Sequence, residues 1–199
     1  DERSRYLRKM VVKTLDSGKR AHLGSAMSIM ELIRVLYDDF LRYDITNLKD
    51  HNRDRFILSK GHGCLAQYVV LADKGFFDKK ELLRFCHADS ILGGHPEYGK
   101  IPGVEASTGS LGHGIPIGVG MALAAKLQNR KSRVIIIVGD GETNEGSVWE
   151  AAMSAVKHKL SNLTVIIDYN KIQSYGFVSE VLDTEPMAEK WASFGFAVE

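Results

Sequence analysis

The sequence contains few of the residues that mark secreted, membrane or nucleic-acid-binding proteins. It has two cysteines among 199 residues, Cys64 and Cys86, and no Cys-x-x-Cys pair, so a disulfide framework is excluded and a reducing cytoplasm is the expected location. Its 26 basic residues balance 25 acidic ones, which leaves no excess charge to attract nucleic acid or an anionic membrane. The longest apolar runs, residues 134–138 and 163–167, are too short to span a bilayer, and residues 1–5 lack the apolar core of a signal peptide. We therefore expect a cytoplasmic protein with neither a nucleic-acid partner nor a membrane partner.

Proline is also scarce, with 4 residues, whereas glycine is frequent, with 19. The region 89–114 holds seven of these glycines and two of the prolines, so it is expected to form neither a helix nor a strand. A loop of that length inside a compact domain is uncommon and is usually functional. We therefore expect this region to contribute to a site.

The remaining sequence alternates between helical and strand patterns. Apolar residues at helical spacing predict helices over residues 4–15, 27–41, 64–74, 79–88, 115–128 and 147–158. Strands are predicted over residues 55–59, 134–138 and 163–167, and the last two are apolar runs typical of strands buried on both faces of a parallel sheet. A strand, a glycine turn, a helix and a strand form a βαβ unit. The fold class is therefore α/β, a single domain over residues 1–199 with a mainly parallel sheet flanked by helices.

Residues whose side chains could bind a cation follow each of the predicted strands 134–138 and 163–167. Asp140 offers a carboxylate, and Asn170 offers an amide oxygen beside free backbone carbonyls. Ligands of open α/β sheets sit beyond the carboxyl ends of the strands. Oxygen donors suit Mg²⁺ or Ca²⁺, and Gly141 would let backbone amides approach a phosphate. A plain turn in which Asp140 caps a helix would also explain this pattern.

The spacing of these residues discriminates between the possible cofactors. No Gly-x-Gly-x-x-Gly follows the strand in register, which disfavours a nicotinamide-binding Rossmann turn, and no Walker lysine is present. The run Gly139-Asp140-Gly141, with Asn170 about 30 residues after Asp140, resembles the thiamine diphosphate motif, which opens with Gly-Asp-Gly and closes with an asparagine. A metal-bridged diphosphate site is therefore the favoured interpretation.

Histidines in glycine-rich segments make the resemblance more specific. Four of the seven histidines lie beside glycines in predicted loops: His22, His62, His95 and His113. The chain as a whole resembles the N-terminal, diphosphate-binding half of transketolases through five segments in the family's order, residues 22–24, 54–63, 94–97, 102–114 and 139–146. This resemblance covers most of the chain.

The resemblance implies an α/β thiamine diphosphate-binding fold and gives roles to the matching positions. The metal, Mg²⁺ or alternatively Ca²⁺, would be bound by Asp140, Asn170 and the backbone carbonyl of Ile172. The residues implied in cofactor binding are His62, Gly109, Ser110, Leu111, Gly139, Asp140, Gly141, Glu142, Asn170 and Ile172.

The resemblance also implies catalytic roles. His22 and His95 match histidines that hold the hydroxyls of a donor ketose and move protons, His62 would donate to the phosphates as a third catalytic histidine, and His113 would contact the substrate. Histidine suits proton transfer because its pKa lies near the working pH. Glu145 matches a glutamate at the subunit interface, although the preference for acidic residues at helix N-termini would also explain it.

Three departures from the family pattern concern the sugar more than the cofactor. Leu23 follows His22 where the family often has proline, and His113 stands where glutamine is common. Residues 169–176 differ from the sequence that the family typically has at this position. The residues implied in metal and diphosphate binding are intact. The identity of the donor and acceptor sugars is what these changes leave open.

The implied reaction is the transfer of a two-carbon ketol unit from a ketose to an aldose or other aldehyde acceptor. Enzymes of this kind also need a pyrimidine-binding domain, which residues 1–199 lack. We therefore expect a separate partner chain that carries this domain, in an α₂β₂ assembly built on a homodimer. Two alternatives stay open: a subunit of another thiamine diphosphate enzyme that decarboxylates 2-oxo acids or transfers acyl groups, and a non-catalytic cofactor-binding module.

Overall fold

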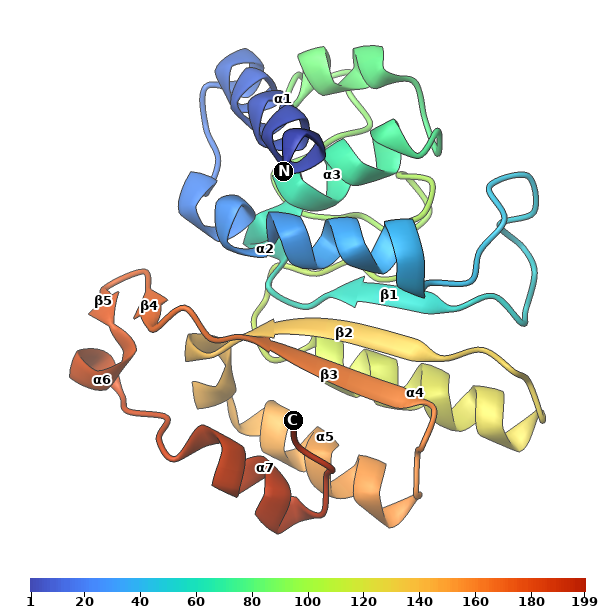
Figure 1. Ribbon diagram of the computed structural model, residues 1–199, viewed down its shortest axis with the longest axis vertical. Coiled ribbons are helices and arrows are strands. Elements are labelled where there is room, and N and C mark those ends of the chain that lie inside the picture. Colours follow the sequence, from blue (N-terminus) through green and yellow to red (C-terminus); the bar gives the residue numbers. More distant parts are fainter.

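Three parallel strands form the centre of the molecule (Figure 1). The computed structural model describes residues 1–199 and contains β1 (Arg55–Leu58), β2 (Val134–Gly139) and β3 (Leu163–Asp168) in the spatial order β1-β2-β3. Arg55 of β1 and Leu163 of β3 both lie opposite Val134 of β2, so the three strands start level with one another. The predicted α/β class with a parallel sheet is confirmed.

Helices cover both faces of this sheet. On one side lie α1 (Glu2–Gly18), α2 (Leu23–Val35) and α3 (Cys64–Asp73), and on the other lie α4 (Gly114–Leu127), α5 (Gly146–Lys157) and α7 (Met187–Phe194) (Figure 1). None of the helices combines the length and the apolar character that crossing a lipid bilayer requires.

A hydrophobic core lies on each face of the sheet. The strand β2 contributes to both cores because its side chains alternate between the faces of the sheet. Ile135 and Ile137 pack into the core formed with α1, α2 and α3, while Ile136 packs into the core formed with α4, α5 and α7. Every residue of β2 is buried. The prediction of a strand buried on both faces is confirmed for this strand.

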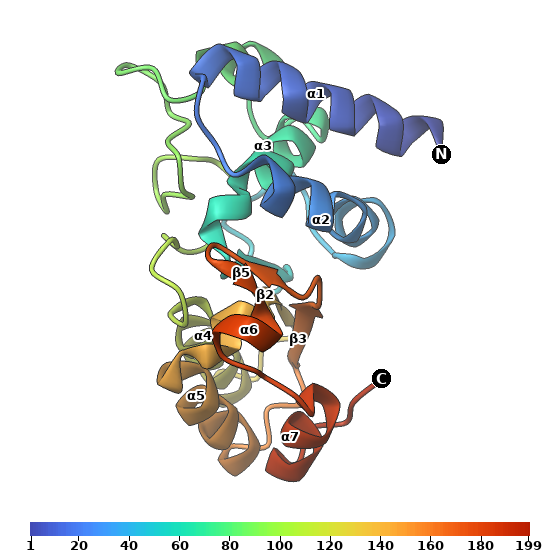
Figure 2. The same ribbon diagram turned by 90° about the vertical axis from the view of Figure 1, so that its left-hand side faces the viewer.

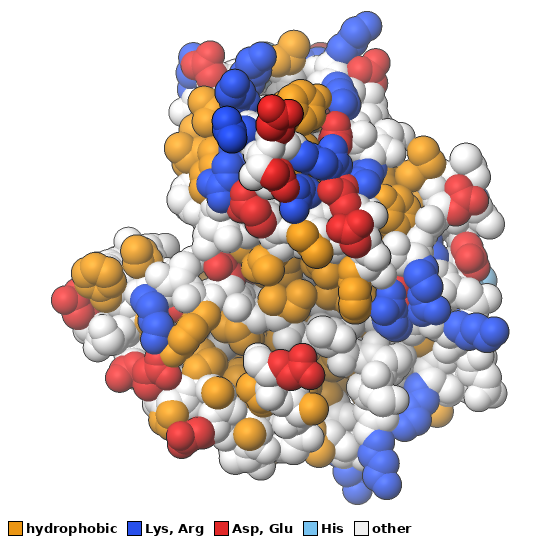
Figure 3. Space-filling model, viewed as in Figure 1, with side chains coloured by type: hydrophobic (Ala, Val, Ile, Leu, Met, Phe, Trp, Pro, Cys, Tyr) orange, Lys and Arg blue, Asp and Glu red, His pale blue; other side chains and the backbone are white.

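That prediction is wrong for β3. Thr164 is exposed, and Val165, Ile166 and Ile167 are only partly buried. The reason is that β3 pairs with β2 alone, so its other edge carries no neighbouring strand in this structure. Figure 3 shows hydrophobic side chains gathered where α2 meets β3, and side chains from this junction line a groove of about 390 Å³.

The helix boundaries depart from the predictions at two places. The predicted helix 27–41 begins earlier, as α2, and ends in a π-helical turn, Leu36–Phe40. The segment 79–88 forms a 3₁₀ helix, Lys79–Arg84, that ends earlier than predicted, because Phe85 (ψ 129°) leaves the helical region and Cys86 then adopts a left-handed backbone (φ 58°).

The sequence predicts no bounds for the elements after β3. They are the hairpin β4 (Ile172–Gln173) and β5 (Gly176–Phe177), the short α6 (Val178–Val181), and α7. Figure 2, turned by 90°, shows the hairpin and α6 together at the level of the sheet.

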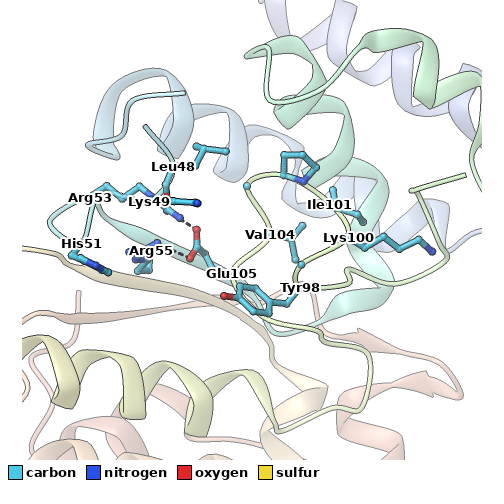
Figure 4. Close-up of a pocket in the computed structure, with 13 residues that line it drawn as sticks. Leu48, Lys49, His51, Arg53, Arg55, Tyr98, Lys100, Ile101, Val104 and Glu105 are labelled. Carbon is cyan, nitrogen blue, oxygen red and sulfur yellow. Dashed lines mark hydrogen bonds and ion pairs between the residues drawn. The ribbon is translucent and has the colours of Figure 1, made fainter. Parts of the chain in front are cut away.

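The region 89–114 forms neither helix nor strand before its last residue, as predicted, and it runs along one side of the molecule from the upper helices to α4 (Figure 2). Buried polar contacts fix it to both ends of β1. Glu105 binds Arg53 at 2.5 Å and Arg55 at 3.1 Å beside a pocket of about 480 Å³ (Figure 4). Thr108 Oγ1 donates to the carbonyl of Leu58, the last residue of β1, at 2.7 Å. The loop therefore has a defined path despite its glycine content.

The contact between α4 and β2 gives a stability prediction. A Cβ on Gly118 would lie 2.3 Å from Ile136 Cδ1 in the close-packed core, whereas a Cβ on Gly120 of the same helix would meet nothing within 4 Å. Gly118→Ala should lower the free energy of unfolding by about 1–3 kcal/mol through overpacking. Gly120→Ala should raise it by about 0.5–1 kcal/mol, because alanine favours the helix. Urea denaturation of both variants measures the difference, and equal stabilities would contradict the packing described here.

Candidate functional site

The two ends of the predicted motif meet at one edge of the sheet. Gly139 at the end of β2 lies opposite Asp168 at the end of β3. Asp140 directly follows β2, and its Oδ1 accepts from the amide of Gly141 at 2.8 Å. Its Oδ2 accepts from the amide of Lys171 at 2.6 Å, which ties the turn after β2 to the loop after β3. The structure therefore brings the predicted metal ligands Asp140 and Asn170 into one place.

The Asn170 side chain has a fixed orientation. Its Nδ2 donates to Asp168 Oδ2 at 2.9 Å and to Ser28 Oγ at 3.2 Å. Its Oδ1 accepts from the amide of Ile172 at 2.9 Å, and a second lone pair of this oxygen is left for another partner. Ile172 is 58% exposed and its side chain has no polar atom, so a contribution of this residue to the site would come from its backbone.

Three of the four predicted histidines converge from separate parts of the chain. His22 stands just before α2, His62 lies in a 3₁₀ turn (Gly61–Gly63) after β1, and His95 belongs to the loop 89–114. The ring centroids of His22 and His62 are 5.3 Å apart, and those of His22 and His95 are 6.4 Å apart. The structure thus groups the residues that the sequence predicts to be catalytic.

Glycines allow these loops to approach so closely. A Cβ on Gly109, where φ is 150°, would lie 2.8 Å from Cδ2 of His95. A Cβ on Gly61 would lie 2.7 Å from the carbonyl of Thr108. The His62 turn, the turn at Gly109 and His95 are therefore in direct packing contact.

Burial keeps the imidazoles of His62 and His95 neutral. Burial lowers the pKa of His62 to about 4, and the positive charge of Lys60 and the neighbouring histidines lower it further. Burial and His22 also lower the pKa of His95. A neutral imidazole has one N–H donor and one acceptor nitrogen. His62 and His95 can therefore both donate and accept a hydrogen bond at neutral pH.

Glu142 connects three parts of the site. Its Oε1 accepts from Ser59 Oγ at 2.5 Å and from the amide of Gly112 at 2.9 Å, and its Oε2 accepts from the amide of Gly139 at 3.1 Å. Burial raises the pKa of this carboxyl, and the three hydrogen bonds partly oppose the shift. Glu142 thus joins β1, the loop 89–114 and β2, while its predicted cofactor contact stays a prediction.

Other predicted residues lie around this centre. His113 is exposed, with its Nδ1 2.9 Å from the carbonyl of Leu111, and it does not belong to the group of three rings. Glu145 is exposed at the start of α5. Ser110 is exposed as well. The roles of these residues in substrate, interface and cofactor contacts stay predictions.

A buried ion pair that the sequence motifs did not predict lies beside the motif. Lys60 Nζ lies 2.5 Å from Asp168 Oδ2, and Ser28 Oγ donates to Asp168 Oδ1 at 2.7 Å. The sequence holds a signal for this pair, since Asp168 ends an apolar strand and Lys60 stands two residues after another. Charged side chains are almost never fully buried unless they are paired.

The site also contains buried polar atoms that have no partner within the protein. Gln173 Nε2 is unpartnered, and the side chain of Gln173 lies against Gly141, with its Cβ 3.0 Å from the position of a Cβ there. Ser25 Oγ is likewise unpartnered and lies 3.2 Å from the position of a Cβ on Gly63, next to His62. Buried donors of this kind normally have an acceptor. An anionic cofactor with several acceptor oxygens therefore fits these residues.

Comparison with known proteins shows the family of the chain. Residues 2–199 match the family described as "Transketolase, thiamine diphosphate binding domain". The chain is 44% identical, over 96% of its length and 69% of the relative's, to one of the subunits of apulose-4-phosphate transketolase from Actinobacillus succinogenes. It is 37% identical, over 97% of its length and 70% of the relative's, to 6-deoxy-6-sulfo-D-fructose transketolase subunit SqwG of a Clostridium species.

Solved structures show the same fold. Transketolase from Leishmania mexicana superposes with a TM-score of 0.92 at 33% identity, over 98% of this chain and 30% of that one. Transketolase from Campylobacter jejuni gives a TM-score of 0.89 at 31% identity, over 97% of this chain and 31% of that one. The chain thus spans less than a third of these solved enzymes. It belongs to the transketolase family, as a thiamine diphosphate binding domain.

Proposed function

We propose that this chain is the diphosphate-binding subunit of a transketolase that transfers a two-carbon ketol unit from a ketose to an aldose or other aldehyde, with thiamine diphosphate and Mg²⁺. The observation that carries the proposal is the meeting of two groups of residues. Asp140 and Asn170 lie together at the ends of β2 and β3. Three histidines with centroids 5.3 and 6.4 Å apart lie at the loops of the same region.

Oxygen atoms of the motif would bind the metal. Asp140, Asn170 Oδ1 and the carbonyl of Ile172 are hard donors of the kind that Mg²⁺ prefers, and Ca²⁺ accepts the same donors. The amide of Gly141, together with His62, Ser25 and Gln173, would donate to the diphosphate. When bound, thiamine diphosphate supplies the electron sink needed to break and form a carbon–carbon bond.

The three histidines would orient the sugar and move protons. His22 and His95 would hold the hydroxyls of the donor ketose, since their rings lie together at the surface of the site. The lowered pKa of His95 keeps it neutral, so it can accept a proton from a hydroxyl and return it. His113, which is exposed at the start of α4, would contact the substrate further out.

This arrangement favours transketolase chemistry over the other thiamine diphosphate reactions. The 2-oxo acid enzymes share the diphosphate motif but generally lack the segments that carry His62 and His95. A non-catalytic module would not need the metal ligands, and these are all present. The names of the two relatives refer to different ketoses, so we propose only the class of the substrates.

A partner chain would complete the active site. Both relatives are named as subunits of transketolases, and the thiamine diphosphate binding domain is the family that residues 2–199 match. We propose that a second chain brings the pyrimidine-binding domain with its activating glutamate, in a cytoplasmic α₂β₂ assembly. Glu145 is exposed at the N-terminus of α5 and would lie at the interface between subunits.

Cofactor binding tests the metal assignment. Isothermal titration of the complex with thiamine diphosphate and Mg²⁺ should show binding that Asp140→Ala weakens by at least about 10- to 100-fold, because an anionic ligand of the ion is lost. Asp16→Ala is the matched control, since Asp16 is 77% exposed and pairs only with Lys19. Equal affinity of the Asp140→Ala variant and the wild type would overturn the assignment.

Turnover tests the need for a partner. The chain alone should show no ketol transfer, whereas the complex with its partner should convert a ketose and an aldehyde in a coupled assay. His95→Ala in the complex should lower kcat/KM by about 10²- to 10⁴-fold, the range for loss of a proton-transferring group. Full turnover by the isolated chain would contradict the proposed division of the active site. Decarboxylation of a 2-oxo acid in place of ketol transfer would favour the other class of enzyme.

The lowered pKa of His62 predicts a pH dependence. In the unfolded chain the imidazole binds a proton near pH 6.5, whereas in the folded protein it does so only near pH 4. The unfolded state therefore binds more protons between these values, so the fold loses stability as the pH falls from about 6.5 to 4. NMR of the His62 ring should show the neutral form at pH 5, and His62→Gln should reduce this loss of stability. A His62 signal that titrates near pH 6.5 would contradict the prediction.

A further inference from the structure

The buried ion pair of Lys60 and Asp168 adjoins both ends of the proposed cofactor motif. Their side chains are only 3% and 6% exposed, and their charged atoms are 2.5 Å apart. The lysine stem passes 3.9 Å from the position where a side chain on Gly139 would begin. Asp168 stands opposite Gly139 in the sheet and two residues before Asn170.

Asp168 also orients a proposed metal ligand. Its Oδ2 accepts from Asn170 Nδ2 at 2.9 Å, and its Oδ1 accepts from Ser28 Oγ, which itself accepts from Asn170 Nδ2 at 3.2 Å. With the NH₂ group held on this side, the amide oxygen of Asn170 is turned the other way. The acceptor oxygen of Asp168 is therefore the feature that sets which atom Asn170 presents to a metal ion.

This carboxylate would create an electrostatic conflict if it were alone. Diphosphate and Asp168 are both anionic, and their repulsion is strong at a site with little water between them. A bound Mg²⁺ offsets only part of the charge of the diphosphate. A buried carboxylate without a partner is also costly to the fold.

We propose that Lys60 is a positioning residue of the cofactor site: by neutralising Asp168, it lets Asp168 orient Asn170 without repelling the diphosphate. The inference rests on the proposed function, because it assumes that the diphosphate occupies this edge of the sheet. The charge of Lys60 reaches the site, since it contributes to the lowered pKa of His62. Lys60 thus acts through Asp168 on the anion and on the metal ligand.

Four forms of the full complex test the pair: wild type, Lys60→Met, Asp168→Asn and the double variant. The affinity for thiamine diphosphate is measured by calorimetric titration at saturating Mg²⁺, with thermal unfolding recorded beside it. Lys79→Met is the matched control, because Lys79 forms an ion pair with Asp73 that is distant in the fold from the motif. The wild-type titration tests the proposed function itself, since no binding there would reject that function and not the role of Lys60.

We expect only one of the two single variants to weaken cofactor binding. Lys60→Met should weaken binding on the order of 30-fold, because Asp168 is left unpaired beside the anion. Asp168→Asn should bind no more weakly than the wild type, because the amide oxygen can still accept from Asn170 while the negative charge is gone. The double variant should return to within about threefold of the wild type, as expected for two coupled residues.

Other results would overturn the proposal. If Lys60→Met bound the cofactor as the wild type does, the ion pair would have no role in binding. If the double variant were as weak as Lys60→Met, the ammonium would act on the diphosphate directly and not through Asp168. Should a single variant fail to fold, the double variant, which has no unpaired buried charge, still decides between these outcomes. NMR gives a second readout: the pKa of His62 should rise in Lys60→Met and stay unchanged in Lys79→Met.

Discussion

The parallel pairing of β2 with β1 and β3 is the constraint on which the rest of the site depends. Because the three strands run in one direction and start level, their carboxyl ends bring the turn of His62, the Gly-Asp-Gly turn and the loop of Asn170 to one edge. The side chains of β2 alternate between two cores, so the strand cannot shift by one residue without turning its whole apolar set to the wrong face. The position of Asp140 is therefore fixed by the burial of the isoleucines that precede it.

The fold class, most helices and the residues of the motif could be predicted from local sequence patterns. The apolar periodicity and the glycine turns predicted the fold class and most helices, and the motif with its histidines predicted the residues that the structure brings together. Local sequence patterns did not predict the contacts between residues that are far apart in the chain. The partners Lys60 and Asp168 are 108 positions apart, and Glu142 meets Ser59 across 83 positions. Nothing in the local pattern around Lys60 specifies which acid it meets, since that depends on the order of the strands.

The edge position of β3 is a second feature that the local sequence did not predict. Its apolar run resembles that of β2, yet only β2 has a strand on each side. The burial of a strand depends on its place in the sheet, which the composition of the strand does not record. The region 89–114 is a related case, because its composition predicted a loop whereas the contacts of Glu105 and Thr108 that hold it are tertiary.

The open side of β3 has a consequence for handling the protein. A row of unpaired amide and carbonyl groups, flanked by half-buried Val165, Ile166 and Ile167, is a template for intermolecular strand addition. Strand addition at this edge is a route to self-association of residues 1–199 produced by themselves. A charged residue placed at Thr164, the exposed position of this strand, would act as a gatekeeper against such aggregation.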